Sequence, residues 1–575
     1  LEGQSVTLAG RIKALRLSGK IGFTTMEDES LPEGFQFVFK KDLLESAPLT
    51  FDDFKQLFDK GDYIQVTGTL ERSRRGEASL FATEYTILTK ALRSLPEKLD
   101  DIEQKYRKRY VDMKLHPEVR EMFEMKSRFW GSGREFMKSH GFLEVQAPTM
   151  EHTTGGAEAE PFVTHHHALD EDYFLRISSE LYLKRYIVGG YEKVFDIDKN
   201  FRNEGIDDEH LQEYLQLEYY WAYSDFDQLV SFSEELFKHM IRETFGTLEL
   251  TKNGQVVDWS KEWPRLPYYE FVEHYAGIKL QEYDTVEKLR GLADELGLKY
   301  DESDGYGRLV DLIYKKTARP KCIEPVWLID VPVELSPLAK RDPENPKNTL
   351  RCQLIAYGSE LCNGYAELND PVDQLNRFEE QQALRDAGDE EAMMPDYDFV
   401  EALEYGMPPT CGFGFSERVF SVLMEKPIRE TTAFPMVKKK DQKVVTICGS
   451  MKFKHEFLEA KEVLEAKGVK VFVPDLSESM DYSTMSDEEI RTQKGILIQK
   501  HFKKIAESDA ILVWNQEKND IPGYVGGNTL VEMGYAFGIE KDIFLLNPVP
   551  EISYADEIKG MNPTVLDGEL GNLPV

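Results

Sequence analysis

The chain has little cysteine and no long apolar run, and both absences narrow what it can be. Five cysteines occur in 575 residues, and no two of them have the CxxC spacing. An odd count without paired spacing argues against a disulfide framework and against structural zinc, so we expect a cytoplasmic protein. No stretch approaches the ~20 apolar residues that a membrane helix needs. No secretory leader pattern opens the sequence, so no membrane partner is expected.

Positive charge is also scarce. The formal net charge is −34, which argues against non-specific nucleic-acid binding by the chain as a whole, because phosphate contacts need Lys and Arg. The shortage of positive charge is uneven along the chain. Residues 1–100 contain 14 basic and 16 acidic residues, whereas the other 475 residues carry a net −32. We therefore expect any nucleic-acid surface in the first segment, extended by the basic run KYRKR at 105–109.

The length predicts three or four domains. Residues 1–95 contain five short strand-like runs separated by turns, with one helix-like segment, FDDFKQLFDKG, after the third run. Five strands with a helix after the third are typical of an OB-fold barrel. Such barrels bind single-stranded nucleic acid by stacking bases on exposed aromatic side chains. The first domain is therefore predicted to be an OB-fold.

Two strand-like runs flank a polar turn between residues 194 and 223. In the second run, Tyr214, Gln216, Glu218 and Tyr220 alternate with Leu215, Leu217, Tyr219 and Trp221. The polar and aromatic face predicts the floor of a pocket, although an ordinary hairpin with a solvated face fits the pattern equally well. Arg202 lies where the first run enters the turn, and its planar fork suits phosphate or carboxylate oxygens.

FRNEG and the aromatic–Glu strand that follows it resemble motif 2 of the class II aminoacyl-tRNA synthetases. Four longer segments are similar to the bacterial lysyl-tRNA synthetases: ELYLKRYIVGGYEKVFDIDKNFRNEG from Glu180, VPVELSPLAK from Val331, NGYAELNDPVDQ from Asn363 and ALEYGMPPTCGFGFSER from Ala402. The similarity runs from about residue 1 to about residue 440. It implies that residues 1–95 bind an anticodon and that residues 105–438 form a catalytic domain on an antiparallel sheet. The helix at 118–140 and the strand after it match motif 1, which implies a homodimer.

The resemblance also implies an ATP site. It assigns ATP contacts to Arg202, Glu204, His210, Tyr214, Glu360 and Arg418, and Mg²⁺ to Glu360 and Gln353. Arg202 would bridge the amino-acid carboxylate and the α-phosphate, and Arg418 would hold the γ-phosphate. Arg202, Glu204 and Arg418 are thus the catalytic candidates of this domain. No general base is needed, because the substrate carboxylate is itself the nucleophile.

A lysine substrate carries two ammonium groups, and burying them needs carboxylates. We assign Glu180 and Glu218 to the α-amino group, and Tyr365 and Glu367 to the ε-ammonium. An aspartyl enzyme of the same fold would need a basic residue in place of Glu367. The resemblance adds Gly156 and Asn363 to the lysine site.

The resemblance further assigns anticodon recognition of tRNA(Lys) to Phe23, Gln36 and Glu84. Taken alone, Phe23 could equally be a core aromatic.

Two positions depart from the family. The motif 2 loop reads EHLQEY where the family commonly has RHNPEF, so Glu209 stands where an Arg contacts the γ-phosphate. Gln353 stands where the family has a Glu that ligates Mg²⁺. We expect activity nonetheless, because Arg202, Glu204, Glu360 and Arg418 are retained. The three consecutive histidines at 165–167 are not expected to bind metal, because neighbouring side chains of an extended chain diverge.

Residues 443–575 read as a separate, small, doubly wound parallel α/β domain. Apolar strands alternate with helices, and Ser450, Asp475 and Asn515 lie at expected strand ends. GGNTLVEMGYAFG, from Gly526, resembles the catalytic helix start of nucleoside 2-deoxyribosyltransferase-like proteins, with Glu532 at the nucleophile position. Gly526 departs from the usual Asp of that motif. A nucleotide-binding or purely structural appendage therefore remains the alternative.

The whole chain is thus predicted to be a multidomain α+β and α/β protein. Its predicted activity is that of a lysine–tRNA ligase with a fused domain that binds a nucleotide or processes an N-glycosidic bond. Two alternatives remain. The chain could transfer lysine to an acceptor other than tRNA, or it could be a nucleotide-metabolism enzyme with a regulatory synthetase-like part.

Overall fold

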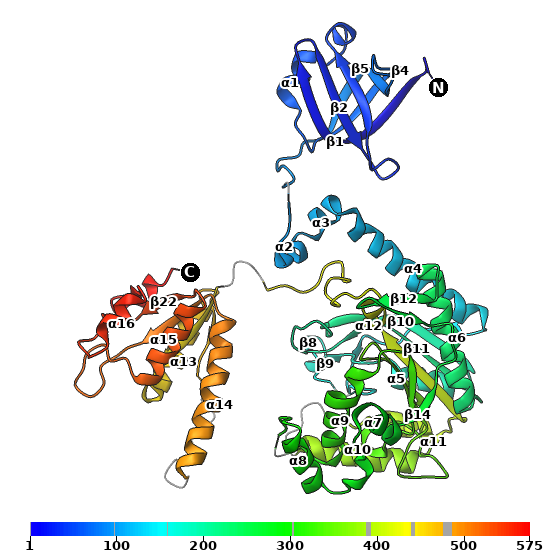
Figure 1. Ribbon diagram of the computed structural model, residues 1–575, viewed down its shortest axis with the longest axis vertical. Helices are drawn as coiled ribbons and strands as arrows, with labels where there is room; N and C mark the ends of the chain where they lie inside the picture. The colour runs from blue at the N-terminus through cyan, green and yellow to red at the C-terminus, as the bar shows by residue number, and fades with distance from the viewer. Residues whose placement is uncertain are drawn as a thin grey trace. The chain divides into compact units, whose positions relative to one another are not determined.

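The computed structural model describes residues 2–96, 98–157, 159–301, 304–386, 393–438, 443–474 and 486–574. The chain divides into two compact units, Leu1–Pro435 and Met436–Val575 (Figure 1). Among the described residues, every helix is too short or too polar to cross a bilayer.

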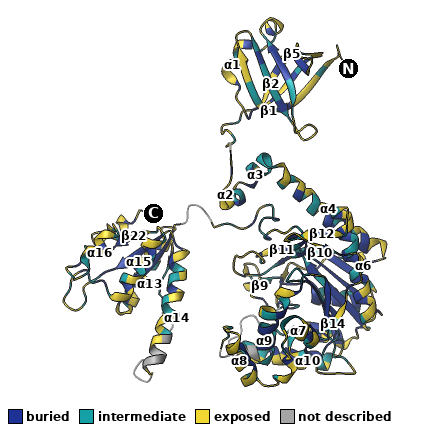
Figure 2. Cartoon of the chain, in the orientation of Figure 1, coloured by how far each residue is buried: buried dark blue, intermediate teal, exposed yellow. Residues whose placement is uncertain are grey.

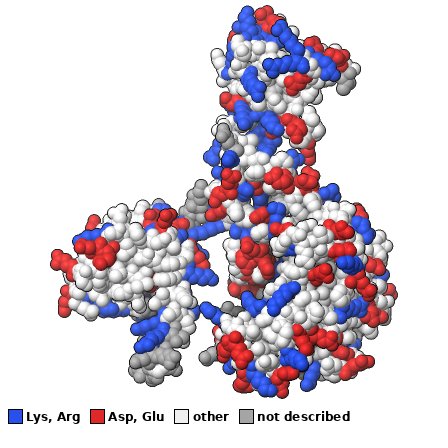
Figure 3. Space-filling view, viewed as in Figure 1, with Lys and Arg blue, Asp and Glu red and all other residues white. Residues whose placement is uncertain are grey.

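The first unit begins with a closed five-stranded barrel in the order β1-β2-β3-β5-β4. Its strands are β1 (Ser5–Ser18), β2 (Ile21–Glu27), β3 (Phe35–Lys40), β4 (Tyr63–Arg72) and β5 (Ala78–Thr89). Helix α1 (Phe51–Leu57) follows the third strand, and Thr50 and Asp53 close its first turn as a reciprocal capping box. The predicted OB-fold arrangement is confirmed. On the face seen in Figure 3, Lys and Arg side chains lie among Asp and Glu over this barrel.

The barrel places the three predicted anticodon residues outside its core. Phe23 is half-buried on β2 and does not belong to the barrel's hydrophobic core, which Phe37 and Phe39 fill from the neighbouring strand. Gln36 Nε2 donates to Glu77 Oε2 at 2.8 Å, and Glu84 is exposed on β5. The reading of Phe23 as a core aromatic is therefore wrong.

An eight-stranded sheet forms the centre of the rest of this unit, in the order β14-β15-β16-β17-β18-β11-β10-β6. In that order the strands are Arg265–Pro267, Val326–Ile329, Arg351–Ala356, Ser359–Ala366, Thr410–Ser416, Glu213–Ala222, Lys193–Phe201 and Leu143–Glu144. All neighbouring strands are antiparallel except β14 with β15 and β10 with β6.

One face of this sheet packs into a hydrophobic core, and the other face lines a cavity. Helices α4 (Pro117–Ser139) and α6 (Phe226–Phe245) pack against the core face, where Leu217 and Tyr219 of β11 are fully buried. These strands are the dark-blue centre of the unit in Figure 2. On the opposite face of β11, the side chains of Gln216, Glu218 and Tyr220 point toward helix α5 (Glu180–Val188). The alternation predicted from the sequence is confirmed.

The remaining elements surround this sheet. The helices are α2 (Ile102–Arg107), α3 (Arg109–Leu115), α7 (Tyr268–Ala276), α8 (Val286–Glu295), α9 (Tyr306–Ile313), α10 (Pro371–Asp386), α11 (Tyr397–Glu404) and α12 (Arg418–Leu423). Strands β7 (Met150–Glu151), β9 (Glu171–Leu175) and β8 (Val163–His166) form a small sheet, and β12 (Glu249–Lys252) pairs with β13 (Gln255–Asp258).

The second unit contains five parallel strands in the order β20-β19-β21-β22-β23. They are Lys470–Phe472, Val444–Gly449, Ala510–Trp514, Asp542–Leu545 and Thr564–Val565. The helices are α13 (Lys454–Glu465), α14 (Asp487–Ala506), α15 (Gly527–Gly538) and α16 (Ala555–Gly560). Strand β23 was not predicted, because two residues are too few to show a period. Asp475 lies outside the described residues.

Candidate active site

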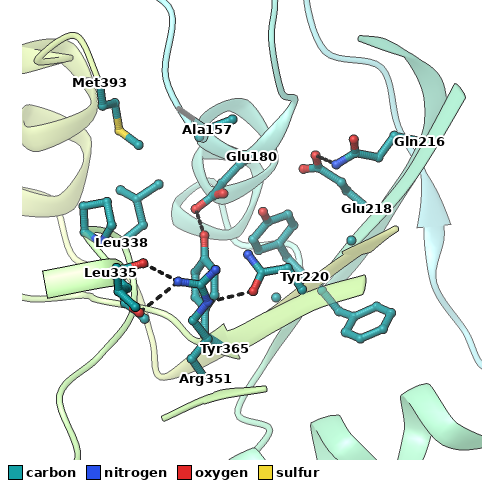
Figure 4. A pocket seen from close by; sticks show the side chains of 18 of the residues that line it. Ala157, Glu180, Gln216, Glu218, Tyr220, Leu335, Leu338, Arg351, Tyr365 and Met393 are labelled. Carbon is teal, nitrogen blue, oxygen red and sulfur yellow. Dashed lines mark hydrogen bonds between the residues drawn. The ribbon is translucent and has the colours of Figure 1, made fainter. Parts of the chain in front are cut away.

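The polar face of β11 forms the floor of a cavity of about 300 Å³ (Figure 4). Gln216, Glu218 and Tyr220 line it from this strand. The other predicted residues that line it are Gly156, Glu180 of α5, Arg202, and Glu360, Asn363 and Tyr365 of β17. Residues more than 200 positions apart in the sequence therefore meet in one cavity.

A buried lysine that the sequence reasoning missed links Glu180, which lines this cavity, to Glu367, which is buried and lines neither this cavity nor the one that adjoins it. Lys184 Nζ contacts Glu180 Oε1 at 2.7 Å and also pairs with Glu367, and the Lys184 side chain is fully buried. The Tyr365 hydroxyl donates to Glu180 Oε1 at 2.5 Å. The Glu–Lys spacing of four residues on a helix was the available signal.

Among the described residues, no cationic side chain pairs with Glu218 in this way. Its Oε1 accepts from Ser178 Oγ at 3.0 Å and from Gln216 Nε2 at 2.5 Å. Its Oε2 is buried, with no hydrogen-bond partner among the residues that the structure describes. Burial, with the charges of Asp196 and Glu180 acting in the same direction, raises the pKa of Glu218 to about 8.

Lys184 stays charged in this setting. Burial opposes its charged form, but Glu180 and Glu367 outweigh burial, so the pKa of Lys184 is raised. Burial also raises the pKa of Glu367 well above its ordinary value. Oε1 of Glu367 is a second buried carboxylate oxygen without a hydrogen-bond partner in the described part of the chain. One buried ammonium thus serves two carboxylates, and the cavity is short of positive charge.

Three glycines make room for these side chains. A Cβ at Gly412 would overlap with the Glu367 carboxylate and the Tyr220 ring, and one at Gly414 would come within 3.0 Å of Glu218. Gly156 has φ +86°, and a Cβ there would lie 2.7 Å from Ser178 Oγ. Without a side chain, Gly412 leaves room for Glu367 and Tyr220.

A second cavity, of about 140 Å³, adjoins the first. Arg202, Gln216, Glu360, Asn363 and Gly414 line both cavities. The predicted ATP residues Glu204, His210, Tyr214 and Arg418 line the second one.

Arg202 lies between the two cavities, with its guanidinium 5.4 Å from the Tyr214 ring centre. Within the described residues its Nε is buried and has no hydrogen-bond partner. An arginine in this position can contact an anion that extends from one cavity into the other.

The two residues that depart from the family, Glu209 and Gln353, differ in exposure and in whether they line a cavity. Glu209 lines the second cavity and is exposed, and its carbonyl accepts a hydrogen bond from Arg418 Nε at 3.2 Å. Gln353 is buried on β16 and lines neither cavity. Of the two predicted metal residues, Glu360 alone lines either cavity.

Sequence reasoning assigned no role to two further residues of the first cavity. Tyr220 was visible in the alternation of β11. Arg351 donates from Nε to Asn363 Oδ1 at 2.8 Å, so the Asn363 side chain is already engaged. Arg351 also donates to Ser336 Oγ at 3.0 Å and to the Leu335 carbonyl. Its position depends on strand pairing, which a linear motif does not reveal.

Comparisons with known proteins match the barrel and the domain that contains the cavities. The family described as tRNA synthetases class II (D, K and N) matches residues 101–438, and the OB-fold nucleic acid binding domain matches residues 6–88. A lysine–tRNA ligase of Moorella thermoacetica is 43% identical over 448 residues, covering 77% of this chain and 90% of the relative. A lysine–tRNA ligase of Pelotomaculum thermopropionicum is 42% identical over 448 residues, covering 77% and 88%. One of Thermotoga maritima is 41% identical over 445 residues, covering 76% and 87%. The chain therefore belongs to the class II tRNA synthetases of the D, K and N group, among the lysine–tRNA ligases.

Proposed function

We propose that this chain is a lysine–tRNA ligase, which activates L-lysine with ATP to lysyl-adenylate and transfers it to tRNA(Lys). One observation carries the choice of amino acid. Two buried carboxylate oxygens, Glu218 Oε2 and Glu367 Oε1, have no hydrogen-bond partner among the described residues. A substrate with two ammonium groups supplies a donor to each, and burying such groups without carboxylates is costly.

The same residues explain why lysine is preferred to other substrates of the D, K and N group. The side chains of aspartate and asparagine carry no cation. With either of them bound, Glu367 would still share the single charge of Lys184 with Glu180. A negative side chain would in addition meet Glu180, Glu218 and Glu367 in a buried setting. We assign Glu218 to the α-amino group and Glu367 to the ε-ammonium. Glu180 and Tyr365, which are hydrogen-bonded to each other, complete the wall.

Activation takes place where the two cavities adjoin. Arg202 contacts both the lysine carboxylate and the α-phosphate, and so aligns nucleophile and electrophile. Tyr214 stacks on adenine, and Arg418 holds the terminal phosphate from the start of α12. Glu204 and His210 line the same cavity. Charge that develops on the phosphate is stabilised by these arginines, which are already in place.

Mg²⁺ is the cofactor that accompanies ATP in this proposal. Glu360 lines both cavities and would hold it, whereas Gln353 lines neither. One carboxylate is sufficient, because protein-bound Mg²⁺ keeps several waters and takes further ligands from the substrate phosphates. The ion supplies neutralisation of phosphate charge.

Lysine-dependent exchange of pyrophosphate into ATP tests the activation step. We expect exchange with lysine and none with aspartate or asparagine. Absence of exchange with lysine would overturn the proposal. Lysylation of transcribed tRNA(Lys) tests the second step, and exchange without lysylation would instead indicate an acceptor other than tRNA.

We propose three domains for this activity. Residues 1–95 bind the anticodon through Phe23, Gln36 and Glu84, residues 105–438 catalyse, and residues 443–575 bind a nucleotide in a doubly wound α/β domain. The third assignment rests on the resemblance of GGNTLVEMGYAFG to nucleoside 2-deoxyribosyltransferase-like proteins, in which Glu532 would attack the nucleoside. The catalytic domain is proposed to pair two chains through its motif 1 segment.

A further inference from the structure

The second unit contains a buried group of three potential metal ligands that the synthetase activity does not use. Cys448 lies on β19, His501 on α14 and Glu532 on α15. Their ligand atoms all lie within 4.8 Å of one another. Cys448 and His501 are buried, and 14% of the Glu532 side chain is exposed.

Two of the three distances within this group are close to those of ligands around one ion. Cys448 Sγ lies 3.5 Å from His501 Nε2, and His501 Nε2 lies 3.6 Å from Glu532 Oε1. Tetrahedral zinc with bonds of about 2.3 Å to sulfur and about 2.0–2.2 Å to nitrogen and oxygen would space these pairs by about 3.6 and about 3.4 Å. The ligand atoms of the third pair, Cys448 and Glu532, lie within 4.8 Å of each other.

The orientation of the imidazole excludes the other common use of such a triad. In a nucleophile–His–acid relay, the nucleophile and the acid bind opposite ring nitrogens. Here Cys448 and Glu532 both approach Nε2. Three side chains that converge on a common point, rather than forming a chain, are arranged around a shared partner.

The charges agree with a divalent cation. A thiolate and a carboxylate together balance a doubly charged cation, and a neutral imidazole completes the set of donors. Oε2 of Glu532 is buried without a hydrogen-bond partner in the described part of the chain.

We propose that Cys448, His501 and Glu532 form a three-ligand site for a zinc-like divalent cation, with a fourth position left for water or a substrate. A mixed thiolate, imidazole and carboxylate set selects zinc or a neighbouring transition metal over Mg²⁺ or Ca²⁺, which prefer oxygen ligands. The bound ion would occupy the carboxylate that the transferase resemblance assigns to nucleophilic attack.

Cobalt binding to the metal-free full-length chain tests the site. Co²⁺ is added to chelator-treated protein in excess Mg²⁺, which occupies sites made of oxygen ligands. We expect one Co²⁺ per chain, visible d–d bands of tetrahedral cobalt, and a thiolate-to-cobalt charge-transfer band that Zn²⁺ removes. Because the wild-type chain is used, absence of the charge-transfer band would overturn the proposal without any question of misfolding.

Variants identify the ligands. Cys448→Ser should abolish the charge-transfer band, and Glu532→Gln should weaken Co²⁺ binding by more than about tenfold. Cys322→Ser is the matched control, because it removes a buried cysteine of the first unit that hydrogen-bonds to carbonyls. Circular dichroism and the thermal midpoint of each metal-free variant report its folding.

A folded Cys448→Ser that keeps the band would overturn the assignment. A folded Glu532→Gln with wild-type cobalt affinity would show that this carboxylate is free to act as a nucleophile.

Discussion

At the scale of single residues, the proposed lysine cavity depends on carboxylates that lack enough positive charge. Lys184 pairs with Glu180 and Glu367, whereas the described residues that hydrogen-bond to Glu218 are neutral. Burial, with the charges of Asp196 and Glu180 acting in the same direction, raises the pKa of Glu218 to about 8. A substrate ammonium would reverse the shift, because an adjacent cation favours the ionised carboxylate.

Lysine affinity should therefore depend on pH. Below pH 8 the empty cavity holds a proton on Glu218 that must leave when the ammonium binds. The KM for lysine should rise by about tenfold per pH unit as pH falls from 8 toward 6, and should level off above 8. Steady-state pyrophosphate exchange at saturating ATP measures this slope. Glu218→Gln should bind lysine more weakly and remove the slope, and a flat profile in the wild type would contradict the assignment.

Glu209 offers a gain-of-function test of the ATP cavity. Glu209→Arg replaces an exposed carboxylate beside the phosphate site with a guanidinium, and an exposed charge contact is worth about 1 kcal/mol, or roughly fivefold. The KM for ATP should fall by that factor while the KM for lysine stays unchanged. Asp208→Arg is the matched control, since it adds the same charge at a neighbouring exposed position that lines neither cavity. An equal effect of both variants would indicate general charge attraction only.

At the scale of elements, strands β11 and β18 shape the cavity in different ways. β11 directs Leu217 and Tyr219 to the core and Glu218 and Tyr220 to the cavity. β18 contributes space rather than side chains at Gly412 and Gly414. The pairing of these strands sets Glu218 opposite Gly414, so the register itself determines that the carboxylate fits.

Gly412→Ala should therefore damage lysine binding selectively. Its methyl group would overlap with Glu367 and Tyr220, and overpacking of this kind costs about 1–3 kcal/mol. The expected loss in kcat/KM for lysine is roughly 5- to 150-fold, with the KM for ATP unchanged. Gly131→Ala on α4 is the control, because nothing lies within 4 Å of its added methyl. A loss of ATP affinity equal to the loss for lysine would indicate general misfolding instead.

At the scale of the whole molecule, our proposal assigns amino-acid activation and tRNA recognition to separate folds. The barrel has its own core and exposes Glu84, and Phe23 lies outside that core. The cavities are lined entirely by residues from 156 onward. Changes in the barrel should therefore affect tRNA and leave the first chemical step unchanged.

Phe23→Ala tests this separation. Loss of one stacked base costs about 1–3 kcal/mol, so the KM for tRNA(Lys) should rise by roughly 5- to 150-fold. Lysine-dependent pyrophosphate exchange without tRNA should not change. Leu57→Ala, which removes another exposed apolar side chain of the same domain, should leave both measurements unchanged. An unaltered KM for tRNA in Phe23→Ala would remove this residue from the anticodon site.

The proposed homodimer is tested by light scattering. A chain of 66.3 kDa should elute with twice that mass at micromolar concentration. A single-chain mass across the same range would exclude the pairing expected from motif 1.

The sequence by itself determined the local patterns of this protein. Five strands and a helix specify the barrel, alternation along residues 214–221 specifies which side chains of β11 share a face, and long ordered motifs specify the family. Each of these is written within a short stretch of chain, where side-chain direction follows directly from backbone period.

Only the tertiary structure decided which distant side chains share charge. The bridge from Lys184 to Glu180 and Glu367 depends on packing a helix against a sheet, and the union of Cys448, His501 and Glu532 depends on two helices covering one strand. The absence of a CxxC spacing led us to expect no structural zinc, because a linear motif registers only ligands that are neighbours in sequence. Parallel strands and their connecting helices bring together residues 53 and 31 positions apart, and the electrostatics of such a group exist only after that packing.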